Sequence, residues 1–214
     1  MSPTAADALA RLWATRGVEI DESTPDRLDR LRLFGRDAPL VVEIGCGMGE
    51  ATLAMAVADP ARDYLGVDVH TPGLGTLLAR AEAAGVDNVA VARGDAVELL
   101  RDGIEPGSLD AIHVFFPDPW PKVRHHKRRI VRPEIVALMR DRLRVGGTLH
   151  VATDWPHYAG QILAVLTEDP ELRNTAVGFA PRPPSRPLTR FEERGAKAGR
   201  AIRDCVFVRT DVTA

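Results

Sequence analysis

One stretch of the chain places a carboxylate on a rigid segment beside a dense run of cations. Residues 109–116 form a largely apolar run, which predicts a buried strand that ends at the segment 117–121, Pro-Asp-Pro-Trp-Pro. Each proline fixes its own φ and restricts the preceding residue, so we expect this segment to be extended and to present Asp118 and Trp120 outward. The next eleven residues, 122–132, hold six Lys and Arg and no acid. The combination indicates base chemistry next to a phosphate-binding surface.

Glycines predict a second site after an earlier strand. Residues 40–45 read as a short buried strand, and Gly45, Gly47 and Gly49 follow it before an alanine-rich helix. Glycines let backbone approach a ligand, but the spacing lacks the third glycine of a dinucleotide fingerprint and the Gly-Lys-Ser/Thr of a P-loop. What remains is a GxGxG loop with Glu43 two residues before it, which resembles the S-adenosyl-L-methionine (AdoMet) loop of Rossmann-like methyltransferases. A plain β-α turn is the alternative.

Acidic residues recur at the ends of the predicted strands. Asp68 lies at the end of one predicted strand, Asp95 and Asp118 follow the next two, and Glu43 precedes the glycine loop. A single acid in such a place is commonly a helix N-cap, and Asp95 fits that interpretation. Four acids at one edge favour a ligand site. If the ligand is AdoMet, we expect Asp68 to accept from the ribose hydroxyls and Asp95 to lie beside the adenine amine.

The alternation of strands and helices predicts an α/β fold. We expect a Rossmann-like, doubly wound and mostly parallel seven-stranded sheet with helices on both faces. A helical leader would occupy residues 1–37, and a single domain residues 38–214. The expected strands are 40–45, 64–69, 88–93, 109–116, 148–153 and 205–209.

Composition restricts where a polyanion could bind. The 214 residues are 45% hydrophobic and 27% charged, with a net charge of -2, so nucleic-acid binding needs a local patch. Two distant cysteines argue against a disulfide framework or a zinc site and fit a reducing cytosol, so we expect a cytoplasmic protein. Adjacent histidines chelate poorly, and we predict no metal. No signal peptide or membrane span is evident, and a monomer and a homodimer both stay open.

Four motifs together resemble one family. They are FFPDPWPKVRHHKRR at 115–129, Val-His-Thr-Pro-Gly at 69–73, Thr-Asp-Trp at 153–155 and Thr-Arg-Phe-Glu at 189–192. This set is similar to the bacterial tRNA (guanine-N7-)-methyltransferase family, from about residue 40 to residue 209. The resemblance implies methyl transfer from AdoMet to N7 of guanine 46 in the tRNA variable loop.

The resemblance also implies roles for individual residues. The AdoMet pocket would comprise Glu43, Gly45, Gly47, Gly49, Asp68, Asp95 and Asp118, with Asp118 also the catalytic residue. The substrate would contact Lys122, Asp154, Thr189, Arg190, Phe191 and Glu192. The RNA would contact Arg124, His125, His126, Lys127, Arg128 and Arg129. One departure is visible, because the family usually has Glu where this chain has Asp68.

The expected chemistry suits these residue types. Guanine N7 carries a lone pair and no proton, so the reaction needs alignment more than a strong base. We therefore expect Asp118 to orient guanine through its N–H groups and to stabilise the positive charge that develops on the purine. Trp120 either stacks on the base or forms a wall of the pocket.

Simpler interpretations remain for two of the motifs. Thr189 and Glu192 have the spacing of a capping box, and the cationic run could be a solvated helix face. The alternative functions are methylation of another RNA or of an exocyclic amine, and RNA binding without catalysis.

Overall fold

The computed structural model describes residues 1–21, 27–189, 192 and 199–211. Its helices are α1 (Pro3–Arg16), α2 (Arg30–Phe34), α3 (Glu50–Ala58), α4 (Thr71–Ala83), α5 (Ala96–Glu98), the π-helical turn η1 (Leu99–Gly103), the 3-10 helix η2 (Val123–Arg128), α6 (Pro133–Arg142) and α7 (Pro156–Glu168). Its strands are β1 (Gly17–Glu19), β2 (Leu40–Ile44), β3 (Asp63–Asp68), β4 (Val89–Arg93), β5 (Leu109–Phe115), β6 (Leu143–Thr153), β7 (Leu172–Asn174) and β8 (Arg203–Arg209). None of the described helices is both long and apolar enough to cross a membrane.

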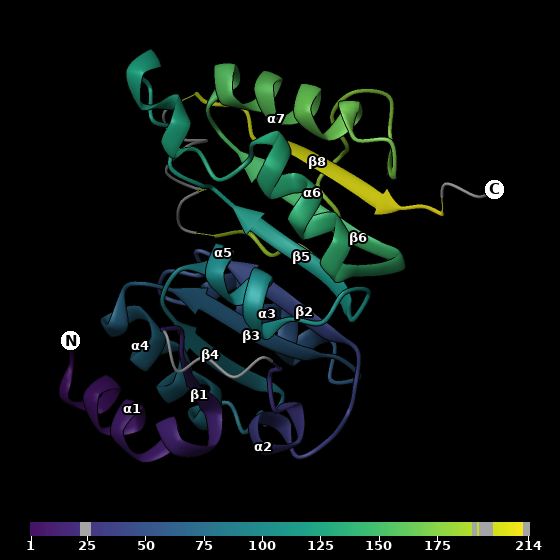
Figure 1. Ribbon diagram of the computed structural model, residues 1–214. Helices are drawn as coiled ribbons and strands as arrows, with labels where there is room; N and C mark the ends of the chain where they lie inside the picture. Colours follow the sequence, from purple (N-terminus) through teal and green to yellow (C-terminus); the bar gives the residue numbers. More distant parts are fainter. Residues whose placement is uncertain (22–26, 190–191, 193–198, 212–214) are drawn as a thin grey trace.

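The strands form one twisted sheet in the order β1-β4-β3-β2-β5-β6-β8-β7. All neighbouring pairs from β1 to β6 are parallel, and β8 runs antiparallel to both β6 and β7. Figure 1 shows α1, β1 and α2 at one end of this sheet and α7 and β8 at the other. The predicted fold class is confirmed, since the arrangement is α/β, mostly parallel and covered by helices on both faces.

The sheet of the described residues has eight strands and not the expected seven. The six strand ranges expected from the sequence correspond to β2 to β6 and β8, whereas β7 was not among them and β1 comes from the segment predicted to be a helical leader. Strand β1 pairs in parallel with β4, Gly17 opposite Val91 and Glu19 opposite Arg93. Arg93 also donates from Nε to a carboxylate oxygen of Glu19 at 2.9 Å. A three-residue strand has no room for an alternating pattern, so the pairing with β4 defines it.

Two apolar layers enclose the sheet because successive strand residues point to opposite faces. Val41 packs in one layer with residues of α1, α3 and α4. Val42 and Ile44 pack in the other with residues of α2, α6 and α7. The chain order reverses between β2 and β5, and ligands of doubly wound sheets bind beyond the strand ends at such a point.

Candidate active site

The loop after β2 has a backbone shape that favours glycine. Gly45, Gly47 and Gly49 have φ angles of 72°, 55° and 71°, all in the left-handed region that glycine enters without a steric penalty. A Cβ on Gly49 would also lie 2.6 Å from the Cβ of Leu77 in α4. The loop thus needs glycine for its own shape, and contact of these residues with a cofactor stays a prediction.

Asp68 and helix α4 hold this loop from the side of β3. Asp68 accepts from the backbone N–H of Gly47 through Oδ2 and from that of His70 through Oδ1, both at 2.8 Å. Gly73, which ends the Val-His-Thr-Pro-Gly motif, lies so close that a Cβ there would be 2.0 Å from the carbonyl oxygen of Gly47. Asp68 therefore holds the glycine loop in place, and its contact with a ribose stays a prediction.

Two other acids at strand ends already have protein partners. Asp95 is exposed and caps α5, where its Oδ1 accepts from the backbone N–H of Val97 at 2.8 Å. This contact is the N-cap that the sequence left open as the simpler interpretation. Asp154 follows β6 and forms an ion pair with Arg200, Nε to Oδ2 at 3.1 Å. Both carboxylates lie partly open to solvent.

Glu43 is a buried carboxylate at the base of the glycine loop. Its residue is 4% exposed, and the buried hydroxyl of Thr52 donates to Oε2. Burial raises the pKa of Glu43 to about 7, against the opposing effect of the Thr52 hydrogen bonds. Burial, with Glu43 and Asp68 nearby, also raises the pKa of the Cys46 thiol. Glu43 can therefore exchange a proton near neutral pH at the edge of a cavity.

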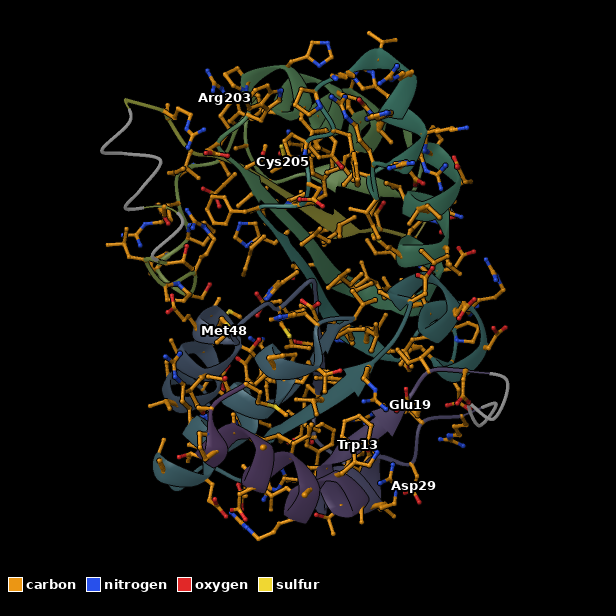
Figure 2. All side chains as sticks on the ribbon, turned by 90° about the vertical axis from the view of Figure 1, so that its left-hand side faces the viewer. Trp13, Glu19, Asp29, Met48, Arg203 and Cys205 are labelled. Carbon is orange, nitrogen blue, oxygen red and sulfur yellow. The ribbon has the colours of Figure 1, made fainter. Side chains whose placement is uncertain are left out.

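That cavity has a volume of about 380 Å³ and opens between the glycine loop and the end of β5. It is lined by Glu43, Gly45, Cys46, Gly47, Met48, Glu50, Ala51, Phe115, Phe116 and Thr189. In Figure 2, Met48 lies between the half of the molecule that carries Trp13 and the half that carries Arg203. Three segments far apart in the chain thus meet around one pocket.

The segment after β5 is bent at both ends. The backbone N–H of Phe116 makes the last bond to β6, to the Ala152 oxygen at 2.7 Å, and Phe116 itself has a φ of 53°. Trp120 has a φ of 41°. Left-handed backbone at a bulky residue costs of order 1–3 kcal/mol and persists only where its surroundings impose it. The extended segment predicted from the prolines is therefore a loop between two left-handed residues, with Asp118 exposed between them.

The cationic run forms η2 and the residues on either side of it. Lys122, Arg124, Lys127 and Arg128 are exposed, and both histidines of the run are partly buried. The Arg128 guanidinium lies over the Trp120 ring, 4.9 Å from its centroid. No acid lies in the first turn of η2, and its cations Arg124, Lys127 and Arg128 are exposed to solvent.

Arg129 differs from the rest of the run because it points inward. It is 1% exposed, and its Nε donates to the carbonyl oxygen of Pro119 at 2.8 Å. Its guanidinium also lies 4.6 Å from the centroid of the Tyr158 ring and donates to Gln161. Burial lowers the pKa of Arg129. Its place supports the proline segment from beneath, which differs from the RNA contact expected from the sequence.

The Thr189–Glu192 motif reaches the same cavity from the C-terminal part of the chain. Thr189 lines the cavity, and its Oγ1 accepts from the backbone N–H of Glu192 at 3.3 Å, as in a capping box. The Glu192 carboxylate is buried and accepts from Arg186, Nη1 to Oε2 at 2.6 Å. Arg190 and Phe191 lie outside the described residues, and so do residues 193–198.

Comparison with known proteins places the chain among methyltransferases. Residues 37–205 match a family model described as "Putative methyltransferase". The tRNA (guanine-N(7)-)-methyltransferase of Streptomyces avermitilis is 53% identical over 206 residues, which cover 95% of this chain and 70% of that protein. The chain belongs to the tRNA (guanine-N(7)-)-methyltransferase family. The Bordetella pertussis member is 50% identical over 203 residues, 95% of this chain and 79% of that protein.

Solved structures agree on the fold of this methyltransferase family member. The 16S rRNA methyltransferase KamB superposes with a TM-score of 0.64 at 16% sequence identity, over 92% of this chain and 99% of that one. An rRNA methylase from Streptococcus thermophilus gives 0.55 at 18% identity, over 82% and 89%. At this identity the likeness shows the fold alone.

The structure gives a place in the site of this methyltransferase to three residues that had no individual role in the sequence-based prediction, two of which, Gly73 and Phe115, belong to the motifs quoted above. Thr52 holds Glu43, Gly73 supports the glycine loop, and Phe115 lines the cavity. Phe115 could have been found from the sequence, since it directly precedes Phe116 in the FFPDPW motif. The role of Arg186 could not have been found in this way, because the proline-rich residues around it indicate only a connecting segment.

Proposed function

We propose that this protein transfers the methyl group of AdoMet to N7 of a guanine in tRNA, at position 46 of the variable loop. The observation that carries the proposal is that Phe115 and Phe116 line the glycine-loop cavity and lead directly into Asp118. A cofactor held by the glycine loop would therefore lie beside the segment that carries the catalytic carboxylate. The names of the relatives supply the substrate class.

The residues around the cavity suit AdoMet. A volume of about 380 Å³ lies in the usual range for small-molecule sites, roughly 300–1,000 Å³. Glu43 offers a buried carboxylate for the amine or a hydroxyl, and the left-handed glycines leave the loop without side chains there. Asp68 and Asp95, at the ends of β3 and β4, would serve the ribose and the adenine. Bound AdoMet supplies an electrophilic methyl group on a sulfonium.

The protein's part in the reaction is alignment and charge stabilisation. Guanine N7 carries its own lone pair, so methyl transfer would need no base and would leave a positive charge on the purine. Asp118 would accept from the N–H groups of guanine and stabilise that charge, with Asp154, which follows the neighbouring strand β6, as a second acceptor. Trp120, between Asp118 and η2, would stack on the base or close the pocket.

The RNA would bind through the cations that face solvent. Lys122, Arg124, Lys127 and Arg128 are exposed on or beside η2, with His125 and His126 partly buried among them. These side chains would contact the phosphates and position the variable loop over Asp118. Arg190, Phe191 and Glu192 would complete the substrate contacts together with Thr189.

The test is methylation of tRNA by the purified protein with labelled AdoMet, followed by mapping of the modified nucleoside. We expect 7-methylguanosine from wild type. Asp118→Asn should methylate at least about 100-fold more slowly than wild type, and its affinity for tRNA should stay within about threefold of the wild-type affinity. Asp102→Asn, an exposed carboxylate on η1, is the matched control and should keep the wild-type rate. A different methylated nucleoside, or an unimpaired Asp118→Asn enzyme, would overturn the proposal.

A further inference from the structure

Arg186 is a fully buried arginine that no motif explains. It is 1% exposed, and arginine is rarely buried to this extent unless it is paired. Its Nε and Nη2 donate to the two carboxylate oxygens of Asp204 on β8, at 2.7 and 3.1 Å. Its Nη1 and Nη2 donate to Glu192, at 2.6 and 3.2 Å. The guanidinium thus joins two buried carboxylates from separate segments.

The sheet fixes one end of this network. Asp204 lies opposite Ala152 of β6, and its Oδ1 is 2.7 Å from Nε2 of His150, also on β6. Although burial acts to raise the pKa of Asp204, hydrogen bonds from His150 and Arg186 hold it below its ordinary value. Asp204 therefore provides a charged anchor on a rigid element.

The other side of the guanidinium faces the end of β5. It lies 5.8 Å from the centroid of the Phe116 ring and 6.0 Å from that of Phe115, within the range of a cation–π contact. Phe116 is the left-handed residue that turns the chain into Pro117 and Asp118. Something outside the local sequence must hold it there, and the Arg186 guanidinium is a fixed group packed against its ring.

We infer that Arg186 is a positioning residue: anchored by Asp204 and Glu192, it packs on Phe116 and sets the direction in which Asp118 leaves the sheet. The inference rests on the proposed function for its catalytic consequence. Its structural part, control of the Phe116 turn, does not depend on the substrate.

Arg186→Lys is the test variant, because lysine keeps the charge but cannot bind two carboxylates with a planar fork. Arg182→Lys is the matched control, since Arg182 is exposed in the same segment and donates to the backbone oxygen of Arg186 at 3.3 Å. Hydrogen exchange is measured at the Phe116 amide, which is bonded to Ala152. We expect exchange at least about tenfold faster in Arg186→Lys, equal to about 1.4 kcal/mol, and no change in the control.

Single-turnover methylation at saturating AdoMet and tRNA is the second readout. We expect a rate at least about tenfold lower for Arg186→Lys, with tRNA affinity within about threefold of wild type. Phe116→Leu and the double variant complete a cycle. If Arg186 acts through Phe116, adding Arg186→Lys to Phe116→Leu should cost less than twofold further.

Unchanged exchange at Phe116, or a double variant that loses the product of the two single effects, would overturn the inference. If Arg186→Lys proves too unstable to purify, Asp204→Asn is the substitute, because it weakens the ion pair that anchors Arg186. It should accelerate exchange of the Phe116 amide at least about threefold, and no acceleration would equally overturn the inference. A wild-type protein that methylates no tRNA would refute the proposed function while the exchange result still decided the role of Arg186.

Discussion

Replacing Glu43 with Gln should change how the stability of the protein depends on pH. The wild-type carboxyl is buried beside Thr52 and has a pKa of about 7 instead of 4.5. Gln has nearly the same shape and offers Thr52 an acceptor oxygen, but it does not titrate. The difference in unfolding free energy between the two proteins therefore isolates the proton on Glu43.

The expected size follows from proton linkage. Between pH 4.5 and about 7 the folded protein holds this proton more tightly than the unfolded chain, so the stability of wild type falls as pH rises through that window. At roughly 1.4 kcal/mol for each tenfold change in proton affinity, the loss is about 3 kcal/mol. It is complete above pH 7 and absent below pH 4.5.

His113 opposes this trend, which makes the variant necessary. Burial, followed by His150 and Arg62, lowers the pKa of His113 to about 3, so wild type also loses stability as pH falls below 6.5. The two effects overlap between pH 4.5 and 6.5 in wild type. His113 is present in both proteins, so subtracting their stabilities removes its contribution.

The assay is urea denaturation of wild type and Glu43→Gln at intervals from pH 4 to pH 8.5. Relative to wild type, the variant should gain about 3 kcal/mol of stability across this range. Glu50→Gln, a partly exposed acid at the start of α3 that lines the same cavity, controls for the loss of a negative charge. A constant difference between wild type and Glu43→Gln would refute the reasoning, because Glu43 would then titrate alike in both states.

Two more predictions concern the cationic run. Replacing Lys127 and Arg128 with Ala should make the slope of log K against log salt for tRNA binding shallower by about two, since each phosphate contact contributes about 0.9. Filter binding from about 50 to about 300 mM salt measures this slope. An unchanged slope would show that the two side chains are ordinary solvated surface residues. Arg129→Gln should leave that slope unchanged, because Arg129 is buried, and should lower the single-turnover rate, because the Pro119 carbonyl loses its donor. A slope reduced by one in Arg129→Gln would mean that Arg129 reaches phosphate after all.

The parts of the fold that the sequence predicts are those that local pattern determines. Apolar strands followed by amphipathic helices predict β2 to β6, and strand β8, which lies between β6 and β7, alternates clearly. The glycine loop was predictable because three left-handed positions so close together strongly favour glycine at each of them. Strand β1 was not, since its three residues acquire their conformation by pairing with β4.

The candidate site was harder to predict where side chains find distant partners. A run of cations looks uniform in sequence, yet Arg129 differs from Arg128 because Tyr158 and Gln161, some thirty residues later, surround it. Glu192 has the spacing of a capping residue, and its carboxylate instead pairs with Arg186. Such contacts follow from the assembled sheet, which no local pattern encodes.

The left-handed aromatic residues show where the site's rigidity originates. Proline stiffens the segment between Phe116 and Trp120, but it cannot place an aromatic residue at positive φ, which that residue type disfavours. At the Phe116 end a buried arginine packs on the ring, and at the other Arg129 binds the carbonyl of Pro119. Because both arginines are anchored elsewhere in the fold, the position of Asp118 is a property of the whole α/β core. Substitutions far from the loop in sequence should therefore change the rate of the reaction more than the affinity for either substrate.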